Sequence, residues 1–242
     1  MSDYPQILGV YSLLIDADIG TGGTAAKHDN VTYWYARQLS AEDFEIQPLN
    51  AHHVPSGVRS VLAEMDFLKQ YTPEPTYYRI HTVPALETLT RKIEMGQEAF
   101  ADGKLDDAEG QFIKALMIDD KSVDANYGLG EVYSEKKEFT KLKEVLNTLL
   151  GLDEAFTFTH RTKFNQFGIS LRKNGHYDES IRYYEKSLEI VASDENVYFN
   201  MARVFFEKGL NDRCISSLEK ALNINPEFME AQKFLKYCKK AM

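Results

Sequence analysis

Hydrophobic residues recur with a helical period over most of the chain after about residue 89. Four small residues mark this recurrence at separations of 34, 38 and 34 residues: Gly96, Gly130, Gly168 and Ala202. Around each of them, larger apolar residues occupy the i, i+3, i+4 and i+7 positions, which lie on one face of a helix. The pattern therefore predicts four repeated units, each of which begins with an amphipathic helix.

A second apolar set follows in each unit, as with Cys214, Leu218 and Ala221 in the last one. Between the two sets, glycine stands at one equivalent offset in three of the units, at Gly103, Gly175 and Gly209. Glycine ends a helix readily because it enters the left-handed region without a Cβ clash. Each unit is therefore predicted to be a pair of helices joined by a tight turn.

These units resemble the tetratricopeptide repeat (TPR), a helix–turn–helix of about 34 residues. The fourth unit matches the family pattern best, with Tyr198, Gly209, Ala221 and Pro226. The repeats are assigned to residues 89–122, 123–156, 161–194 and 195–228, with an insertion at 157–160 and a capping helix at 229–242. The resemblance implies that residues 85–242 form an all-α helical solenoid, a TPR fold of four repeats plus the cap.

The N-terminal part has a different pattern. Residues 7–15, 31–37 and 44–49 are rich in β-branched and aromatic side chains and are predicted to be strands. Prolines are frequent after them, and residues 72–84 are interpreted as an extended, proline-containing linker. The fold class is therefore predicted as α+β by domain, with a small β-rich domain at 1–71 joined to the helical solenoid.

Composition and charge argue against several classes of ligand and cellular location. The net charge of −9 and the pI near 5.2 argue against nucleic acid and against an anionic membrane surface as the main ligand. The longest N-terminal apolar run, 7–15, lacks a basic region before it and is too short for membrane insertion. The two cysteines both lie in helical sequence and imply no disulfide framework, so a cytoplasmic location is expected.

Several groups of residues have the side-chain types found in catalytic or ligand sites. Residues 20–24 are glycine-rich but lack the lysine and spacing of a phosphate-binding loop, which favours a hairpin loop. Asp16 and Asp18 share a strand face but have no partner base or nucleophile. Four histidines, His28, His52, His53 and His81, are candidate metal ligands. None of them has a further ligand at metal-binding spacing. No enzyme activity, cofactor or metal is expected.

Alternation along the second strand separates its aromatic side chains. Trp34 is expected in the core, while Tyr33 and Tyr35 share the other face and remain candidates for surface contacts. The motifs of the PilZ cyclic-dinucleotide-binding domain are absent. The chaperone-binding carboxylate clamp of some tetratricopeptide domains is also absent, because its offsets carry Ile93, Gln97, Gly128, Thr162 and Gln166.

The resemblance implies a concave groove lined by the first helix of each unit. The positions that line this groove in the family correspond here to the predicted partner-binding residues. These are Tyr127, Asn165, Gln166, Arg172, Lys173, Phe199, Asn200, Arg203, Phe206, Phe234 and Tyr237. Glu131 and Lys233 occupy further offsets of the same kind. Aromatic side chains supply contact area, amides bond a peptide backbone and arginines hold carboxylates.

We therefore expect a non-enzymatic adaptor or scaffold that binds a protein or peptide segment carrying acidic and apolar residues. The alternative is a regulatory protein in which the β-domain binds a small molecule and the solenoid relays the signal. Homodimerisation through the N-terminal domain is a further hypothesis, because edge strands and exposed aromatic side chains favour association.

Overall fold

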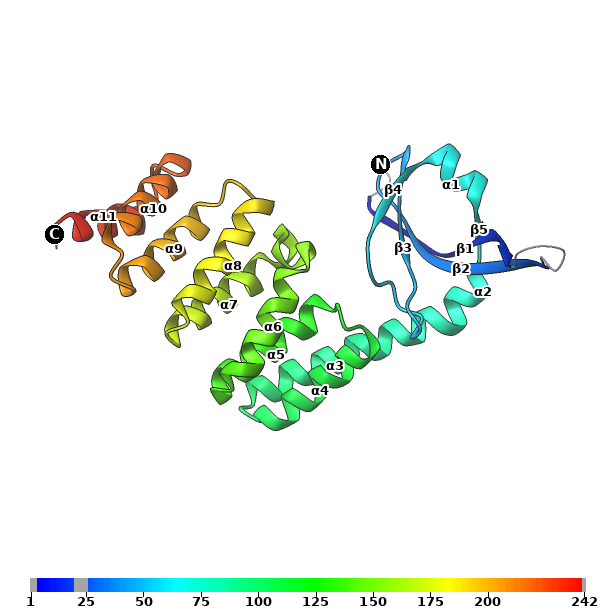
Figure 1. The fold of residues 1–242 in the computed structure, drawn as a ribbon, viewed down its shortest axis with the longest axis horizontal. Coiled ribbons are helices and arrows are strands. Elements are labelled where there is room, and N and C mark those ends of the chain that lie inside the picture. The colour runs from blue at the N-terminus through cyan, green and yellow to red at the C-terminus, as the bar shows by residue number, and fades with distance from the viewer. Residues whose placement is uncertain (1–3, 20–25, 241–242) are drawn as a thin grey trace. The chain divides into compact units, whose positions relative to one another are not determined.

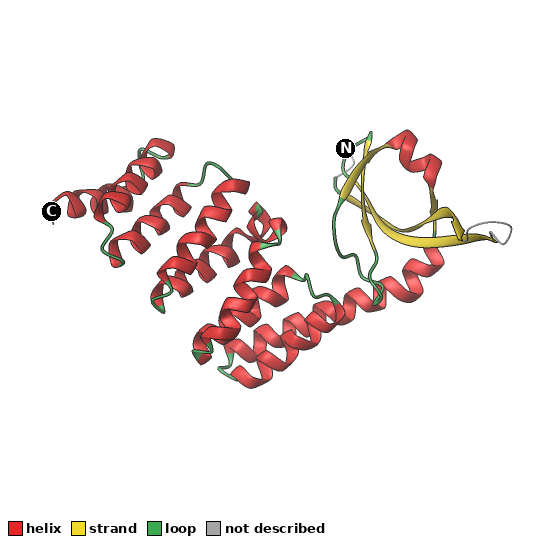
Figure 2. Cartoon of the chain, in the orientation of Figure 1, coloured by secondary structure: helices red, strands yellow, loops and turns green. Residues whose placement is uncertain are grey.

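The computed structural model describes residues 4–19 and 26–240 and divides into two compact units. The first unit contains the chain up to Glu94 together with Lys114–Lys121, and the second contains Met95–Ile113 and the chain from Ser122. The strands belong to the first unit and paired helices make up the second (Figures 1 and 2). The predicted class, α+β by domain with an all-α C-terminal part, is confirmed.

The N-terminal sheet is antiparallel, with the order β4-β3-β2-β1-β5. Its strands are β1 (Gln6–Ile19), β2 (Ala26–Gln38), β3 (Asp43–Pro48), β4 (Ser60–Ala63) and β5 (Tyr71–Pro73). β1 and β2 contain the first two predicted strands and are longer than predicted, and β3 covers the third except for Leu49. The glycine-rich loop at 20–24 lies outside the described residues.

Both faces of this sheet are covered by side chains. On one face the buried core consists of Ala36, Phe44, Ile46, Phe67 and Tyr71, and Trp34 packs against it as predicted. On the other face Tyr35 is only 3% exposed, and its ring lies 6.1 Å from that of Tyr78. Tyr35 is therefore a core residue rather than a surface contact, because the segment after β5 folds back over this face.

The segment at 72–84 is not an extended linker. β5 is followed by α2 (Pro75–Tyr77), the π-helical turn η1 (Tyr78–Thr82) and α3 (Val83–Ala101), while α1 (Glu64–Gln70) precedes β5. Pro75 is the first residue of α2, where the backbone N–H group has no intrahelical partner to lose. Pro84 comes two residues after η1, and α2, η1 and α3 follow one another without a break. π-Helical turns occur mostly as single turns inside α-helices, so the chain remains helical through Pro84.

Polar contacts attach Lys114–Lys121 to the rest of the first unit. Asn50 donates its side-chain N–H to the carbonyl of Ile118 at 2.8 Å, and Ser56 donates its hydroxyl to Asp119 at 2.9 Å. Ile118 is the last residue of α4 (Leu105–Ile118), so the Asn50 amide satisfies a carbonyl that the helix itself leaves unpaired.

The remaining helices follow one another as antiparallel pairs (Figure 1). They are α5 (Val123–Lys136), α6 (Phe139–Leu150), α7 (Arg161–Lys173), α8 (Tyr177–Ile190), α9 (Glu195–Glu207), α10 (Asn211–Ile224) and α11 (Met229–Lys240). The 3-10 helix η3 (Phe158–His160) lies in the predicted insertion at 157–160, and η2 (Asp153–Phe156) lies just before it, at the end of the predicted second repeat. α11 corresponds to the predicted capping helix.

The turn between paired helices is left-handed, as the glycine pattern predicts. Gly103, Gly175 and Gly209 have φ angles of 75°, 78° and 79°. In the second repeat the equivalent residue is Lys137, which also has a positive φ of 59°. The turn geometry is therefore kept even where the sequence has no glycine.

Glycines inside the first helices allow aromatic rings to approach closely. A Cβ on Gly168 would lie 2.5 Å from the Cζ atom of Tyr184, and a Cβ on Gly130 would lie 2.5 Å from the Phe167 ring. Gly110 in α4, in contrast, has no heavy atom within 4 Å of an added Cβ. The same substitution should therefore have opposite effects at these sites.

We expect Gly168→Ala to lower the free energy of unfolding, by about 1–3 kcal/mol, because Tyr184 must leave its packed position. Gly110→Ala should raise it by roughly 0.5–1 kcal/mol, because alanine lowers the entropic cost of forming a helix. Urea unfolding followed by circular dichroism measures both. A Gly168→Ala protein as stable as wild type would show that the close approach to Tyr184 is not needed.

Candidate protein-binding face

The predicted binding residues lie on α5, α7 and α9, the first helices of repeats two, three and four, and on α11. Successive first helices are joined by polar contacts. Lys163 of α7 donates to Asp124 of α5 at 2.6 Å, and the hydroxyls of Ser134 and Ser170 lie 2.6 Å apart. We call the predicted groove residues Glu131, Asn165, Gln166, Lys173, Arg203, Phe206 and Lys233 the inner face.

Asn165 and Asn200 lie together, as the repeat offsets predict. The Asn200 Nδ2 group donates to Asn165 Oδ1 at 3.2 Å, which links α7 to α9. Asn165 is half-buried and Asn200 is buried. This contact uses the Asn165 Oδ1 atom as its acceptor, so the two amides connect successive first helices.

Arg172 was predicted to bind a partner, but the structure shows it buried in a contact within the chain. Its side chain is 7% exposed and forms an ion pair with Glu207 at the end of α9. A buried cation needs such a partner, because an unpaired charge away from water is strongly unfavourable. Arg172 therefore joins two first helices, and its carboxylate partner comes from within the chain.

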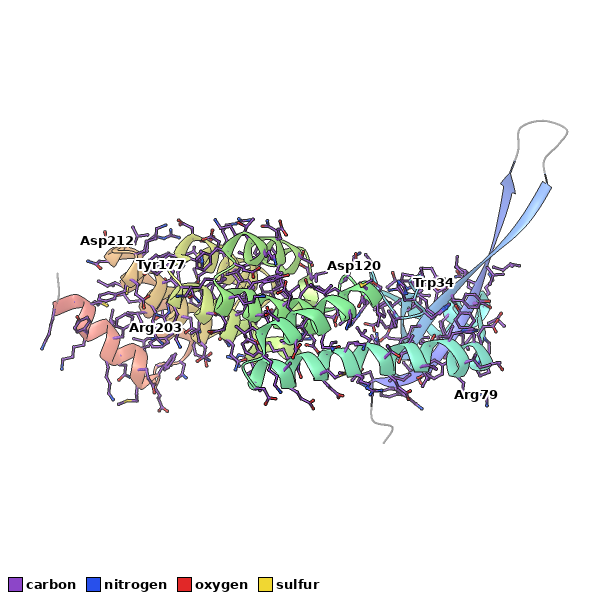
Figure 3. The ribbon with its side chains drawn as sticks, turned by 90° about the horizontal axis from the view of Figure 1, so that it is seen from below. Trp34, Arg79, Asp120, Tyr177, Arg203 and Asp212 are labelled. Carbon is purple, nitrogen blue, oxygen red and sulfur yellow. The ribbon has the colours of Figure 1, made fainter. Side chains whose placement is uncertain are left out.

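Arg203 is the half-buried arginine of α9 on the inner face. Figure 3 shows it on the opposite side of the helical unit from Asp212. Burial raises the pKa of Tyr184, while the guanidinium groups of Arg172 and Arg203 act in the opposite direction. The Tyr184 hydroxyl is buried without a hydrogen-bond partner among the described residues, so the two cations lie near an unsatisfied phenol.

The predicted aromatic residues form a cluster between α9 and α11. Phe199 lies 4.9 Å from Phe228 and 6.2 Å from Phe234, measured between ring centroids. Phe206 lies 5.3 Å from Phe234 and 5.8 Å from Tyr237. α11 therefore covers the apolar part of α9, although Tyr237 remains 57% exposed. We call these five residues the α9–α11 aromatic cluster.

Charged groups complete the inner face. Gln166 and Lys173 are exposed on α7, and Lys233 is exposed on α11. Glu131 of α5 is half-buried, and burial raises the pKa of its carboxyl while the nearby Lys163 lowers it. The inner face thus offers cations on α7, α9 and α11 and a carboxylate on α5.

Tyr127 belongs to the interior and not to the binding face. It is 2% exposed, donates its hydroxyl to the Ala155 carbonyl at 2.7 Å and accepts a hydrogen bond from Tyr183 at 2.6 Å. The repeat offset correctly places it on a first helix, but η2 and α8 pack over it. The offset alone contains no information about these covering segments.

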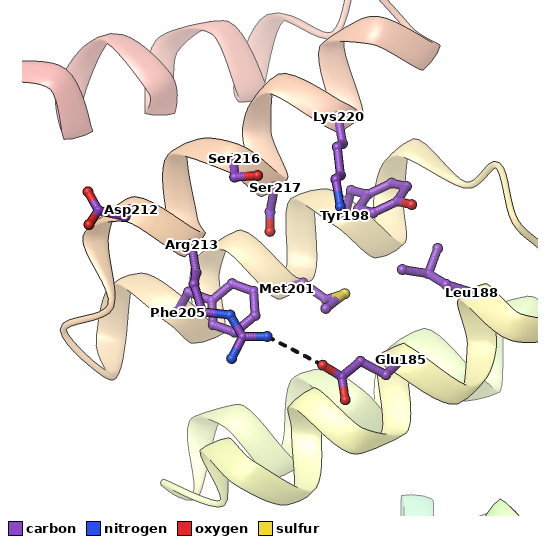
Figure 4. A pocket seen from close by; sticks show the side chains of 10 residues that line it. All are labelled: Glu185, Leu188, Tyr198, Met201, Phe205, Asp212, Arg213, Ser216, Ser217 and Lys220. Atoms are coloured by element: carbon purple, nitrogen blue, oxygen red, sulfur yellow. Dashed lines mark hydrogen bonds and ion pairs between the residues drawn. The ribbon is translucent and has the colours of Figure 1, made fainter.

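A hollow of about 390 Å³, which the repeat offsets did not indicate, lies between α8, α9 and α10 (Figure 4). Its apolar wall includes Leu188 and Met201. Arg213 stands over the Phe205 ring at 4.2 Å and also pairs with Glu185 at 3.4 Å. The cations Arg213 and Lys220 are balanced by the carboxylates Glu185 and Asp212, so the hollow has no strong charge preference.

The structure describes the side chains of only some of the remaining candidates from the sequence. The side chains of Asp16, Asp18 and His28 lie outside those described. His53 and His81 are neighbours, with ring centroids 5.0 Å apart, and His53 Nδ1 lies 2.8 Å from the Tyr77 hydroxyl. Among the side chains that the structure describes, no three histidine, cysteine or carboxylate groups are placed together to hold a metal ion.

We expect Tyr127→Phe to destabilise the protein more than Tyr183→Phe. Removing the Tyr127 hydroxyl leaves both the Ala155 carbonyl and the Tyr183 hydroxyl without partners, at a cost of about 1–3 kcal/mol. Tyr183→Phe removes a single donor, at a cost of about 1 kcal/mol, and Tyr127 keeps its bond to Ala155. Urea unfolding measures both, and equal losses would contradict the observed direction of this hydrogen-bond chain.

Sequence comparison finds curated relatives over part of the chain. The Photosystem I assembly protein Ycf3 of Prochlorococcus marinus (strain NATL2A) is 29% identical over 98 residues, which cover 38% of this chain and 53% of that protein. The protein of the same name from Synechococcus sp. (strain WH7803) is 29% identical over 101 residues. The chain spans about half the length of the curated relatives that it matches.

Solved structures with similar helical stacking include a MamA protein, with 21% identity and a TM-score of 0.49 over 64% of this chain and 82% of that one. Pseudomonas aeruginosa PilF has 20% identity and a TM-score of 0.49 over 63% and 68%. These values are too low to support an inference about function. In the described part of the chain, no helix has the length and apolar character needed to cross a bilayer.

The family model named tetratricopeptide repeat matches residues 164–192 and 195–228. The first match covers most of α7 and all of α8, the second covers α9 and α10, and the second has the bounds predicted for the fourth repeat. The third and fourth helix pairs of this chain are tetratricopeptide repeats.

Proposed function

We propose that the helical unit is a non-enzymatic scaffold that holds a segment of another protein on its inner face. The observation that supports this most directly is the succession of polar contacts between first helices. Asn200–Asn165 and Arg172–Glu207 fix α7 against α9, while Gln166, Lys173 and Arg203 remain on the surface between them. A surface held in place in this way loses little entropy when a partner binds.

The partner is proposed to carry acidic and apolar residues. Lys173 and Arg203 are exposed or half-buried cations in a chain of net charge −9, so they concentrate positive charge on an otherwise acidic protein. Opposite charge across an interface mainly fixes which partner binds and in which orientation. Phe206, three residues after Arg203 on α9, and Tyr237, whose ring contacts that of Phe206, provide apolar surface for the partner.

The curated relatives are named as assembly proteins, and we propose a role of the same general kind here. Holding a segment of an incompletely assembled partner needs a preformed surface and no catalytic group. The similarity to those relatives covers 38% of this chain, so we do not propose that this protein acts on a photosystem.

We expect Arg203→Glu to weaken binding of the partner by about tenfold to a hundredfold, because an attraction is replaced by repulsion of a carboxylate. Partners captured by the full-length protein are identified by mass spectrometry, purified and titrated by calorimetry. Arg182→Glu is the matched control, since it makes the same charge change on the exposed surface of α8.

Circular dichroism establishes that both variants remain folded. If folded Arg203→Glu and Arg182→Glu proteins bind the partner equally, the inner face is not the binding site. The hollow between α8, α9 and α10 would then become the surface to vary.

A further inference from the structure

The two cysteines of the chain are brought into contact by the fold. Cys214 lies in α10 and Cys238 in the last turn of α11, 24 residues apart in sequence, with their Sγ atoms 3.5 Å apart. Both thiols are free and buried, with exposures of 0% for Cys214 and 3% for Cys238. These are all the cysteines that the sequence contains.

We propose that Cys214 and Cys238 form a disulfide under oxidising conditions and that this bond fastens α11 to α10. The sulfur atoms must approach by about 1.5 Å to reach the bonded distance of roughly 2.05 Å. α10 and α11 lie side by side, and each carries a small, fully buried alanine, Ala221 in α10 and Ala231 in α11. This inference is independent of the function proposed for the inner face.

A peroxide is the oxidant that balances the reaction. One thiolate attacks the peroxide, so that an S–O bond forms, the O–O bond breaks and water is released after proton transfer. The second thiolate then attacks the resulting sulfenic sulfur, which forms the S–S bond and releases the oxygen as a second water. Two thiols and one hydrogen peroxide give one disulfide and two waters.

Access to the oxidant depends on α11. The thiolate is the reactive form, and burial together with the adjacent Cys238 raises the pKa of the Cys214 thiol to about 12. Oxidation therefore requires opening of the last turn of α11, which carries Cys238. An exposed ion pair between Lys239 and Glu219, at 2.9 Å, holds this turn against α10.

The disulfide would also keep α11 packed over the α9–α11 aromatic cluster. Phe234 and Tyr237 stand on the same helix as Cys238 and cover Phe206. In the reduced protein α11 is held by non-covalent contacts alone. In the oxidised protein the covering helix is tied covalently to its neighbour.

The test treats the full-length protein with hydrogen peroxide, blocks the remaining thiols and digests it with trypsin. Cleavage after Arg213, Lys220, Lys236 and Lys239 places the two cysteines on the peptides 214–220 and 237–239. The expected product is these two peptides joined by a disulfide within one chain. Recovery of both cysteines as thiols, as separate sulfinic or sulfonic acids, or in disulfides between chains overturns the proposal.

Two further measurements separate a built-in site from chance oxidation. Lys239→Ala should accelerate disulfide formation severalfold by releasing the last turn, whereas Lys240→Ala is the matched control and should leave the rate unchanged. Oxidation should favour the folded state by roughly a few hundredfold, as expected for closing a loop of this length. Cys238→Ser should abolish this gain, and an oxidised protein that unfolds more easily than the reduced one would contradict a disulfide site formed by the fold.

Discussion

The helical unit depends on the absence of a Cβ atom at a few first-helix positions. Phe112 packs where a side chain on Gly96 or Gly128 would lie, Phe167 lies against Gly130, and the Tyr184 ring lies against Gly168. Each contact draws an aromatic ring onto the backbone of a first helix, and packing at this distance leaves no space for a methyl group. The spacing of the helices, and hence of the inner face, follows from these contacts.

These small residues also explain why the repeats could be predicted from the sequence, whereas other features could be predicted only in part. Small residues at a nearly constant separation reveal the repeats, and alternation reveals β1, β2 and β3. Prolines at 73, 75 and 84 suggest an extended linker, but Pro75 begins α2 and Pro84 follows a π-helical turn within a run of consecutive helical elements. Offsets within a repeat placed Asn165 beside Asn200. They gave no account of Glu207 beside Arg172, or of α11 over Phe206, because contacts between repeats depend on segments outside the pattern.

The polar contacts between first helices have a second effect, on the surface available for binding. Arg172 and Asn200 were expected to meet a partner, yet both are buried and satisfied within the chain. Their neighbours Gln166, Lys173 and Arg203 consequently stand on a surface whose backbone is fixed by several bonds. Side chains on such a surface are positioned before any partner arrives, which favours specificity more than strength.

The hydrogen-bond chain from Tyr183 through Tyr127 to Ala155 has a consequence for folding. Stacked repeats usually behave as separate cooperative units that exchange stability with their nearest neighbours. This hydrogen-bond chain joins α5, η2 and α8, so the second repeat, with η2 at its end, and the third repeat share one buried network. Local opening at this junction must break the network as a whole, and amide hydrogens on both sides should exchange with solvent as one block.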